Sequence, residues 1–250
     1  MGLADFERRL FVLVLEWLTR FIEAAAEAVL AFAQRFGVQP NPIDVFMSVP
    51  IWSTGVDKIV DELAVIAEEE WDRTRDSSGV ASIPSGPASS DAFIMANLAN
   101  SRNLLVRIPN EVYELVFAEI TDGVNDGESI PELTQRINNV LSMTASERWQ
   151  NRARVIAITE ANRASNAGSL SFALQAEQIE GIALNKEWVA TNDDRVRPTH
   201  EKADRQRVPL SQPFQVGTSS LMFPGDPMGH ADEVVGCRCS LTIHGSGDGE

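Results

Sequence analysis

The chain has 250 residues and an ordinary apolar share of 44%, which is enough for a sizeable buried core and for two domains. Its formal net charge of -15 at pH 7 excludes a protein that coats duplex DNA, because that binding depends on clustered Lys and Arg. The charge is compatible with a protein that lies near DNA without binding it strongly.

Residues 2–36 are predicted to form one long amphipathic helix that ends before Gly37, Pro40 and Pro42. Charged residues interrupt its apolar run every few positions, so no stretch reaches the roughly 18 uncharged residues that a membrane-spanning helix needs. Its first turn is also too charged for a signal peptide. We therefore expect no membrane segment. The wide apolar stripe fits either a central bundle helix, which we favour, or a helix that docks on a partner or self-associates.

A second helix is expected over about 53–75, beginning near Ser53 or Thr54, with Asp57 placed for a capping box. Residues 76–90 are rich in Ser, Gly and Pro, which indicates a flexible linker. We therefore divide the chain into a helical region at 1–75, this linker, and a second domain at 91–243.

The second domain is expected to be helical first, with helices over about 91–107, after Pro109, from Ser129, and from Thr144 to about 177. From residue 184 onward, short pieces that favour strands alternate with Pro, Gly and Asp turns. Residues 244–250 read as a solvated tail. The fold class is thus α+β, mainly helical in the N-terminal two-thirds, with a small C-terminal α+β module.

The last long helix carries a polar face. Glu160 and Arg163 are spaced for an intrahelical ion pair, and Asn162 and Asn166 lie on an adjoining face. We favour a role in which these side chains organise the loops after residue 190 by hydrogen bonds over a role in catalysis.

All three histidines and both cysteines lie in the C-terminal part of the chain. Asp204 follows His200 by four residues, so in a helix its carboxylate could orient the imidazole. Asp194 with Arg195 and Arg197 reads as a small charged network.

Cys237 and Cys239 are too close in sequence for an unstrained disulfide. If CRCSL is a strand, both thiols share one face and could bind zinc together with His200, and His244 or His230 could be the fourth ligand. Structural zinc is the one cofactor this pattern suggests. Burial as small apolar residues is the default reading, because Cys-x-Cys is not the usual zinc spacing.

No enzyme class is signalled. A Gly-x-Ser-x-Gly elbow and a phosphate-binding Gly loop are both missing from the sequence, and Phe-Pro-Gly-Asp-Pro at 223–227 is a turn by its chemistry. We therefore expect no catalytic residues.

The order of these pieces resembles the phage Mu protein F-like minor head proteins over residues 105–243. The order is a helix with Thr-Glu and Asn-x-x-Arg, a Trp strand, Asp-Arg-Val-Arg, a His, Pro-Gly-Asp-Pro and Cys-Arg-Cys. The positions carried over by the match are Thr159, Glu160, Asn166, Gly168, Trp188, Asp194, Arg197, His200, Asp204, Pro224, Cys237, Arg238 and Cys239. The chain departs from the family where Arg205 and Gln206 follow Asp204 in place of a Gly turn.

The resemblance implies a structural minor capsid protein in the head of a tailed double-stranded DNA phage, made in the host cytoplasm. Such a protein is associated with the portal and other head proteins, and acts in head morphogenesis and in DNA retention or delivery. The helical N-terminal part would then dock to the portal. The alternative is a delivered toxin-like nuclease or transferase that uses His200 and Asp204.

Overall fold

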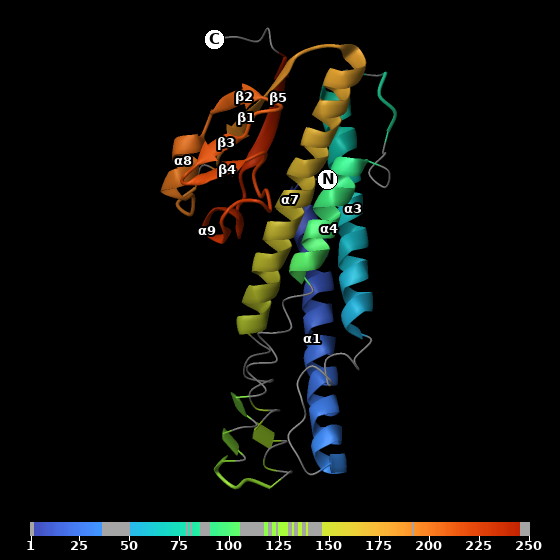
Figure 1. Ribbon diagram of the computed structural model, residues 1–250, viewed down its shortest axis with the longest axis vertical. Coiled ribbons are helices and arrows are strands. Elements are labelled where there is room, and N and C mark those ends of the chain that lie inside the picture. The colour runs from blue at the N-terminus through green and yellow to red at the C-terminus, as the bar shows by residue number, and fades with distance from the viewer. Residues whose placement is uncertain are drawn as a thin grey trace. The chain divides into compact units, whose positions relative to one another are not determined.

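The computed structural model describes residues 3–36, 51–78, 80, 82–85, 91–105, 147–191 and 193–245, with scattered positions between 118 and 139 (Figure 1). Its contacts separate two compact units. One comprises Met1–Phe11, Val60–Ser101 and Val155–Glu250, and the other Val12–Ile59 and Arg102–Arg154. Within the described part of the chain, no helix combines the length and apolar character that crossing a membrane requires.

The first helix, α1 (Leu3–Phe36), agrees with the predicted range. Its side chains at three- and four-residue steps are buried, including Phe6, Leu10, Val14 and Phe21. The predicted stop at Gly37, Pro40 and Pro42 lies outside the described residues.

Helix α3 (Ile51–Ser78) is longer than predicted at both ends. Ser53 and Thr54 lie inside it, so the predicted capping box is wrong. Asp57 instead forms an ion pair with Arg102. The helix continues into the segment expected to be a linker, and beyond it Ile83 is buried. Part of that Ser-rich stretch is therefore packed within the first unit.

Helix α4 (Ala92–Leu105) begins after Asp91, whose carboxylate accepts a hydrogen bond of 2.9 Å from the N–H of Ile94, as an N-cap residue does. Most of residues 106–146, including Thr144, lie outside the described residues. At the predicted start of the helix from Ser129, the N–H and hydroxyl of Ser129 both donate to Glu132 at 2.7 Å. This is one half of a capping box.

The C-terminal module follows α7 (Arg148–Glu180) and contains two small antiparallel sheets. In the larger sheet, β1 (Leu184–Val189) lies between β2 (Arg207–Pro209) and β5 (Ser240–Gly245), and Trp188 is opposite Leu241. Strands β3 (Phe214–Val216) and β4 (Ser219–Leu221) form a hairpin. Two short helices, α8 (Pro198–Ala203) and α9 (Ala231–Val234), complete the module. The fold is α+β, as predicted.

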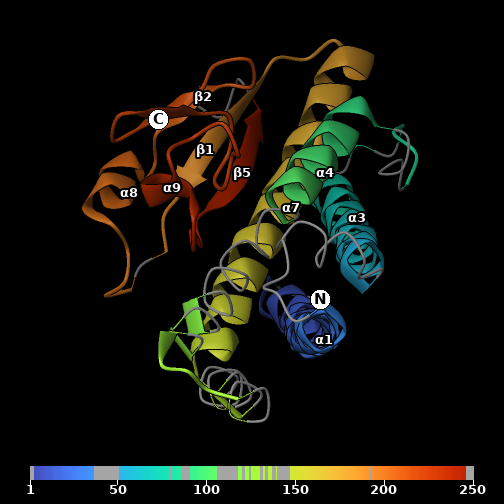
Figure 2. The same ribbon diagram turned by 60° about the horizontal axis from the view of Figure 1, so that its bottom comes forward.

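In the first unit, α7 lies between the module on one side and α3 and α4 on the other (Figure 2). A Cβ at Gly168 would lie 2.3 Å from the carbonyl oxygen of Ala67, so the absence of a side chain lets α7 and α3 approach closely. On its other face, α7 contributes Ala167, Leu170 and Ala173 to a core shared with the module, whose larger members are Trp188, Leu210, Phe214, Val216, Leu221, Phe223 and Leu241.

The predicted strand CRCSL begins late. Strand β5 starts at Ser240, and Cys237 and Cys239 precede it in an irregular segment. Gly236 has φ +69° there, and side chains of α7 bind the N–H groups of Gly236 and Leu241. The segment therefore follows the surface of α7 before it joins β1.

Candidate functional site

The polar face of α7 holds the C-terminal loops by side-chain hydrogen bonds. The hydroxyl of Thr159 donates to the carbonyl of Val155 at 2.7 Å and accepts from the N–H of Gly236 at 2.8 Å. A helix side chain thus satisfies a backbone group of a loop that lacks a strand partner at that point.

Asn166 connects three segments. Its amide nitrogen lies 3.0 to 3.1 Å from the carbonyl oxygens of Asn162, Pro224 and Cys239, and its amide oxygen accepts from the N–H of Leu241 at 2.8 Å. The side chain is 3% exposed. It therefore ties the Pro-Gly-Asp-Pro turn and the start of β5 to α7, using both ends of one amide.

Glu160 and Arg163 form the intrahelical ion pair that their spacing indicates, with N–O distances of 2.7 and 2.8 Å. Both side chains are buried. The Arg163 Nε donates to the carbonyl of Gly225 at 3.0 Å, so the pair also holds the Pro-Gly-Asp-Pro turn. Gly225 has φ +89°, and a Cβ on it would lie 3.3 Å from the Arg163 Cα. Glycine suits this turn by both its backbone angle and its small size.

The same turn is closed by Asp226, a residue that sequence reasoning did not single out. Its two carboxylate oxygens accept from the N–H groups of Met222 and Met228 at 2.7 and 2.9 Å. The buried Lys186 ammonium donates to the carbonyl of Met222 at 2.7 Å and lies 5.2 Å from the Phe214 ring centroid. Burial lowers the pKa of Lys186 to about 8, and Asp226 offsets part of this effect.

The charged turn after β1 differs from its prediction in the carboxylate and in one of the two arginines, because Asp193 pairs with Arg195 and Arg238. Arg238 pairs with Asp193 at 2.7 Å, and Asp194 is exposed. The hydrogen bond from Arg238 lowers the pKa of Asp193 below its ordinary value. Arg197 donates to the carbonyls of Glu233 and Val235, and so binds the segment that leads to the cysteines.

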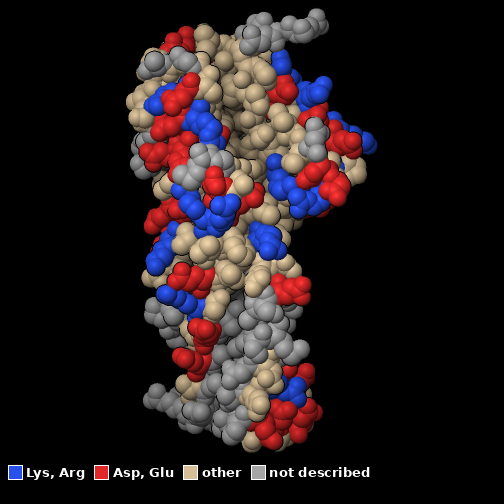
Figure 3. All heavy atoms as spheres, turned by 180° about the vertical axis from the view of Figure 1, so that it is seen from behind, with Lys and Arg blue, Asp and Glu red and all other residues tan. Residues whose placement is uncertain are grey.

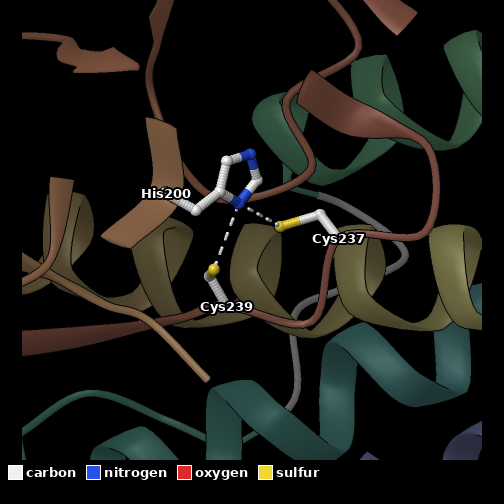
Figure 4. Close-up of side chains that lie close together, drawn as sticks. All are labelled: His200, Cys237 and Cys239. Carbon is white, nitrogen blue, oxygen red and sulfur yellow. Dashed lines mark hydrogen bonds between the residues drawn. The ribbon is translucent and has the colours of Figure 1, made fainter. Parts of the chain in front are cut away.

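His200, Cys237 and Cys239 come together at the centre of the module (Figure 4). The His200 Nδ1 lies 3.3 Å from the Cys239 Sγ and 3.7 Å from the Cys237 Sγ. All three ligand atoms lie within 4.8 Å of one another, and each residue is 2% exposed. The sequence predicted these three as one set, although it expected the thiols on a regular strand.

Glu233, which the sequence analysis missed, orients the imidazole. Its carboxylate lies 3.1 Å from the His200 Nε2 and accepts from the Thr199 hydroxyl at 2.8 Å. The expected partner, Asp204, is the C-cap of α8 and accepts from the N–H of Ala190 at 2.8 Å. Only the fold brings Glu233 to His200, because 33 residues separate them.

Trp188 packs against His200 in a T-shaped arrangement, with ring centroids 5.4 Å apart and planes at 88°. The two thiols are not equivalent. A hydrogen bond from Cys237 lowers the pKa of Cys239, while the pKa of Cys237 is raised by its hydrogen bond to Cys239 and by burial.

The other two histidines lie elsewhere. His244 is on β5 opposite Asn185, with its Nε2 3.1 Å from a Glu187 oxygen, and His230 is exposed at the start of α9. Neither belongs to the cluster that the described residues form around His200.

A family model described as phage Mu protein F like protein matches residues 115–242, just over half of the chain. The range contains every contact described above between α7 and the module. No solved structure matches.

Two curated relatives are similar to parts of the chain. An NAD(+)–arginine ADP-ribosyltransferase, EFV, of Enterococcus faecalis is 30% identical over 136 residues, which cover 54% of this chain and 26% of that protein. An uncharacterized protein, YqbB, of Bacillus subtilis is 26% identical over 146 residues, which cover 57% of this chain and 45% of that protein. The chain thus spans less than half the length of either relative.

Proposed function

The chain belongs to the phage Mu protein F-like family, and from this we propose that it is a structural minor head protein of a tailed double-stranded DNA phage, acting in head morphogenesis. We assign it to the virion, with the portal and other head proteins as partners and with DNA retention or delivery as a further role. The observation that supports this proposal most directly is the family match over residues 115–242.

The geometry of the matched region supports a structural role. The polar side chains that would be candidates for chemistry bind other parts of the protein: Asn166 to three segments, Arg163 to Glu160 and Gly225, and Asp204 to Ala190. Asn166 and Arg163 are buried, so internal hydrogen bonds account for their presence in the core without a catalytic role.

The portal contact is tested by co-expressing the full chain with the portal protein of the same phage and isolating the portal. We place the docking surface on α1, where Val12 is 57% exposed. Val12→Asp is expected to abolish co-isolation, because it puts a charge into an apolar contact. Ile179→Asp on α7, where the side chain is 53% exposed, is the matched control and should retain it. Equal retention by both variants would contradict docking through α1.

The charge supports a position near DNA without strong binding. Figure 3 shows Lys and Arg interspersed with Asp and Glu on the face drawn, and the net charge is -15. A gel-shift titration with duplex DNA at about 0.15 M salt should show no retardation. Tight, salt-dependent retardation would contradict this part of the proposal.

A second candidate function is a delivered transferase, which is favoured by the name of the Enterococcus relative. We propose instead that this chain is not an enzyme. His200 is buried, and both of its ring nitrogens face protein side chains. The full chain incubated with labelled NAD⁺ and a free arginine analogue should transfer no label. Transfer that is lost in His200→Gln while the fold is retained would establish the alternative.

A further inference from the structure

We propose that His200, Cys237 and Cys239 form a zinc site, with the His200 Nδ1 and the two thiolates as protein ligands. The part of the chain that the structure describes brings these three ligand atoms together from α8 and from the segment between α9 and β5.

The distances suit a tetrahedral ion. With Zn–S near 2.3 Å and Zn–N near 2.0 Å, two ligand atoms at a tetrahedral angle lie about 3.5 Å apart for N and S. The observed separations from the His200 Nδ1 are 3.3 Å to Cys239 and 3.7 Å to Cys237. Both N–S separations are therefore close to those of a tetrahedral site. Thiolate and imidazole ligands in this geometry favour zinc over Mg²⁺ or Ca²⁺, which take oxygen ligands.

The tautomer of His200 is set from outside the cluster. The Glu233 carboxylate accepts from Nε2, which leaves the lone pair of Nδ1 directed at the two sulfurs. A carboxylate behind a ligating histidine is the usual arrangement in zinc sites, because it orients the ring and raises its basicity. Glu233 is itself held by the Thr199 hydroxyl at 2.8 Å. It is thus a positioning residue for the metal.

Charge balance also suits the burial. Two thiolates and a neutral imidazole around Zn²⁺ form a neutral group, whereas a thiolate buried without the ion carries an unbalanced charge. The ligand residues are each 2% exposed. Cys-x-Cys is not the usual zinc spacing, but the irregular segment before β5 still brings both thiols within 3.7 Å of the His200 Nδ1.

The bound ion would link α8 to the segment before β5 within the module. Its binding free energy then contributes to folding of the C-terminal module, as in other structural zinc sites. This inference does not depend on the phage role, because it concerns only the contacts within the first unit.

The first test is metal content of the full chain, purified without a metal-affinity column and with reductant present. We expect near-stoichiometric zinc. After chelation, titration with Co²⁺ should give the visible bands of tetrahedral cobalt and a near-ultraviolet thiolate-to-cobalt band. A reduced, folded chain that takes up neither zinc nor cobalt overturns the proposal, and so does a cobalt spectrum without the thiolate band. Both readouts use the unmodified chain, so they do not depend on the folding of a variant.

Variants then assign the ligands. Cys237→Ser and Cys239→Ser should each roughly halve the thiolate-to-cobalt band, and Glu233→Gln should weaken zinc binding about 10- to 100-fold without changing the spectrum. The control is His230→Gln, since His230 is exposed and outside the cluster. It should retain full zinc, while His200→Gln loses it. Equal zinc content in these two histidine variants would overturn the assignment of His200.

Discussion

Replacing Asn166 with Ala is expected to lower the free energy of unfolding much more than replacing the nearby Asn162 with Ala. Asn166→Ala leaves the N–H of Leu241 and the carbonyls of Pro224 and Cys239 without their hydrogen-bond partner. Each buried polar group left without a partner costs about 1–3 kcal/mol. For three such groups, partly relaxed, we expect the free energy of unfolding to fall by about 3–5 kcal/mol, a large share of the roughly 5–15 kcal/mol that domains have.

Asn162 supplies the matched control. It lies one turn earlier on α7 and is 1% exposed, but its side-chain amide has no hydrogen-bond partner among the described residues. Asn162→Ala therefore breaks no side-chain bond of that set and should cost about 1 kcal/mol or less. Both variants are measured by urea unfolding, followed by tryptophan fluorescence and far-ultraviolet circular dichroism. A loss at Asn166 no larger than that at Asn162 would refute the reasoning.

Three further predictions concern the same module. Gly225 has φ +89° and lies against α7, so Gly225→Ala should lower the free energy of unfolding by about 1–3 kcal/mol. Gly181→Ala, at φ +64° where a Cβ meets open space, should lower it less. Equal urea midpoints for the two variants would contradict this prediction. Glu160→Gln should lower the free energy of unfolding by about 3–5 kcal/mol, because it leaves the Arg163 charge buried without its partner. Adding Arg163→Met to this variant should restore stability if the unpaired charge is the cause. The folded pKa of Lys186, about 8, lies below the unfolded value of 10.5, so the unfolded chain binds more protons between them. Stability should therefore rise with pH through that window, and the rise should be smaller in Lys186→Met when urea midpoints are compared at about pH 7.5 and about pH 9.5.

Much of the local structure could be predicted from the sequence, because its causes are local. Apolar residues at three- and four-residue steps predict α1 and most of α3, and the change to short strand-favouring pieces after residue 184 predicts the α+β module. The concentration of His and Cys near the C-terminus also indicated which residues to consider together. The family resemblance was confirmed over residues 115–242.

Boundaries and partners were predicted less well. The sequence put the start of α3 at Ser53 or Thr54, whereas the helix already includes Ile51, and it put Cys237 and Cys239 on a strand that begins only at Ser240. In the second case, side chains of α7 bind the Gly236 N–H and the Cys239 carbonyl, which are backbone groups that strand pairing would otherwise use. Strand propensity depends on neighbouring residues, so it cannot predict hydrogen bonds with side chains that lie more than 70 residues away in the sequence.

The sequence by itself determined which motifs are present and in what order: a helix with a polar face, a Trp strand, His200 and a Cys-x-Cys. Only the tertiary structure decided which of them meet. It placed Glu233 behind His200 and Asp204 against the Ala190 N–H, and it paired Asp193, rather than the predicted Asp194, with arginine side chains. The physical reason is that a carboxylate binds whichever donor the packed backbone brings within about 3 Å, and that distance is set by the whole fold rather than by spacing along the chain.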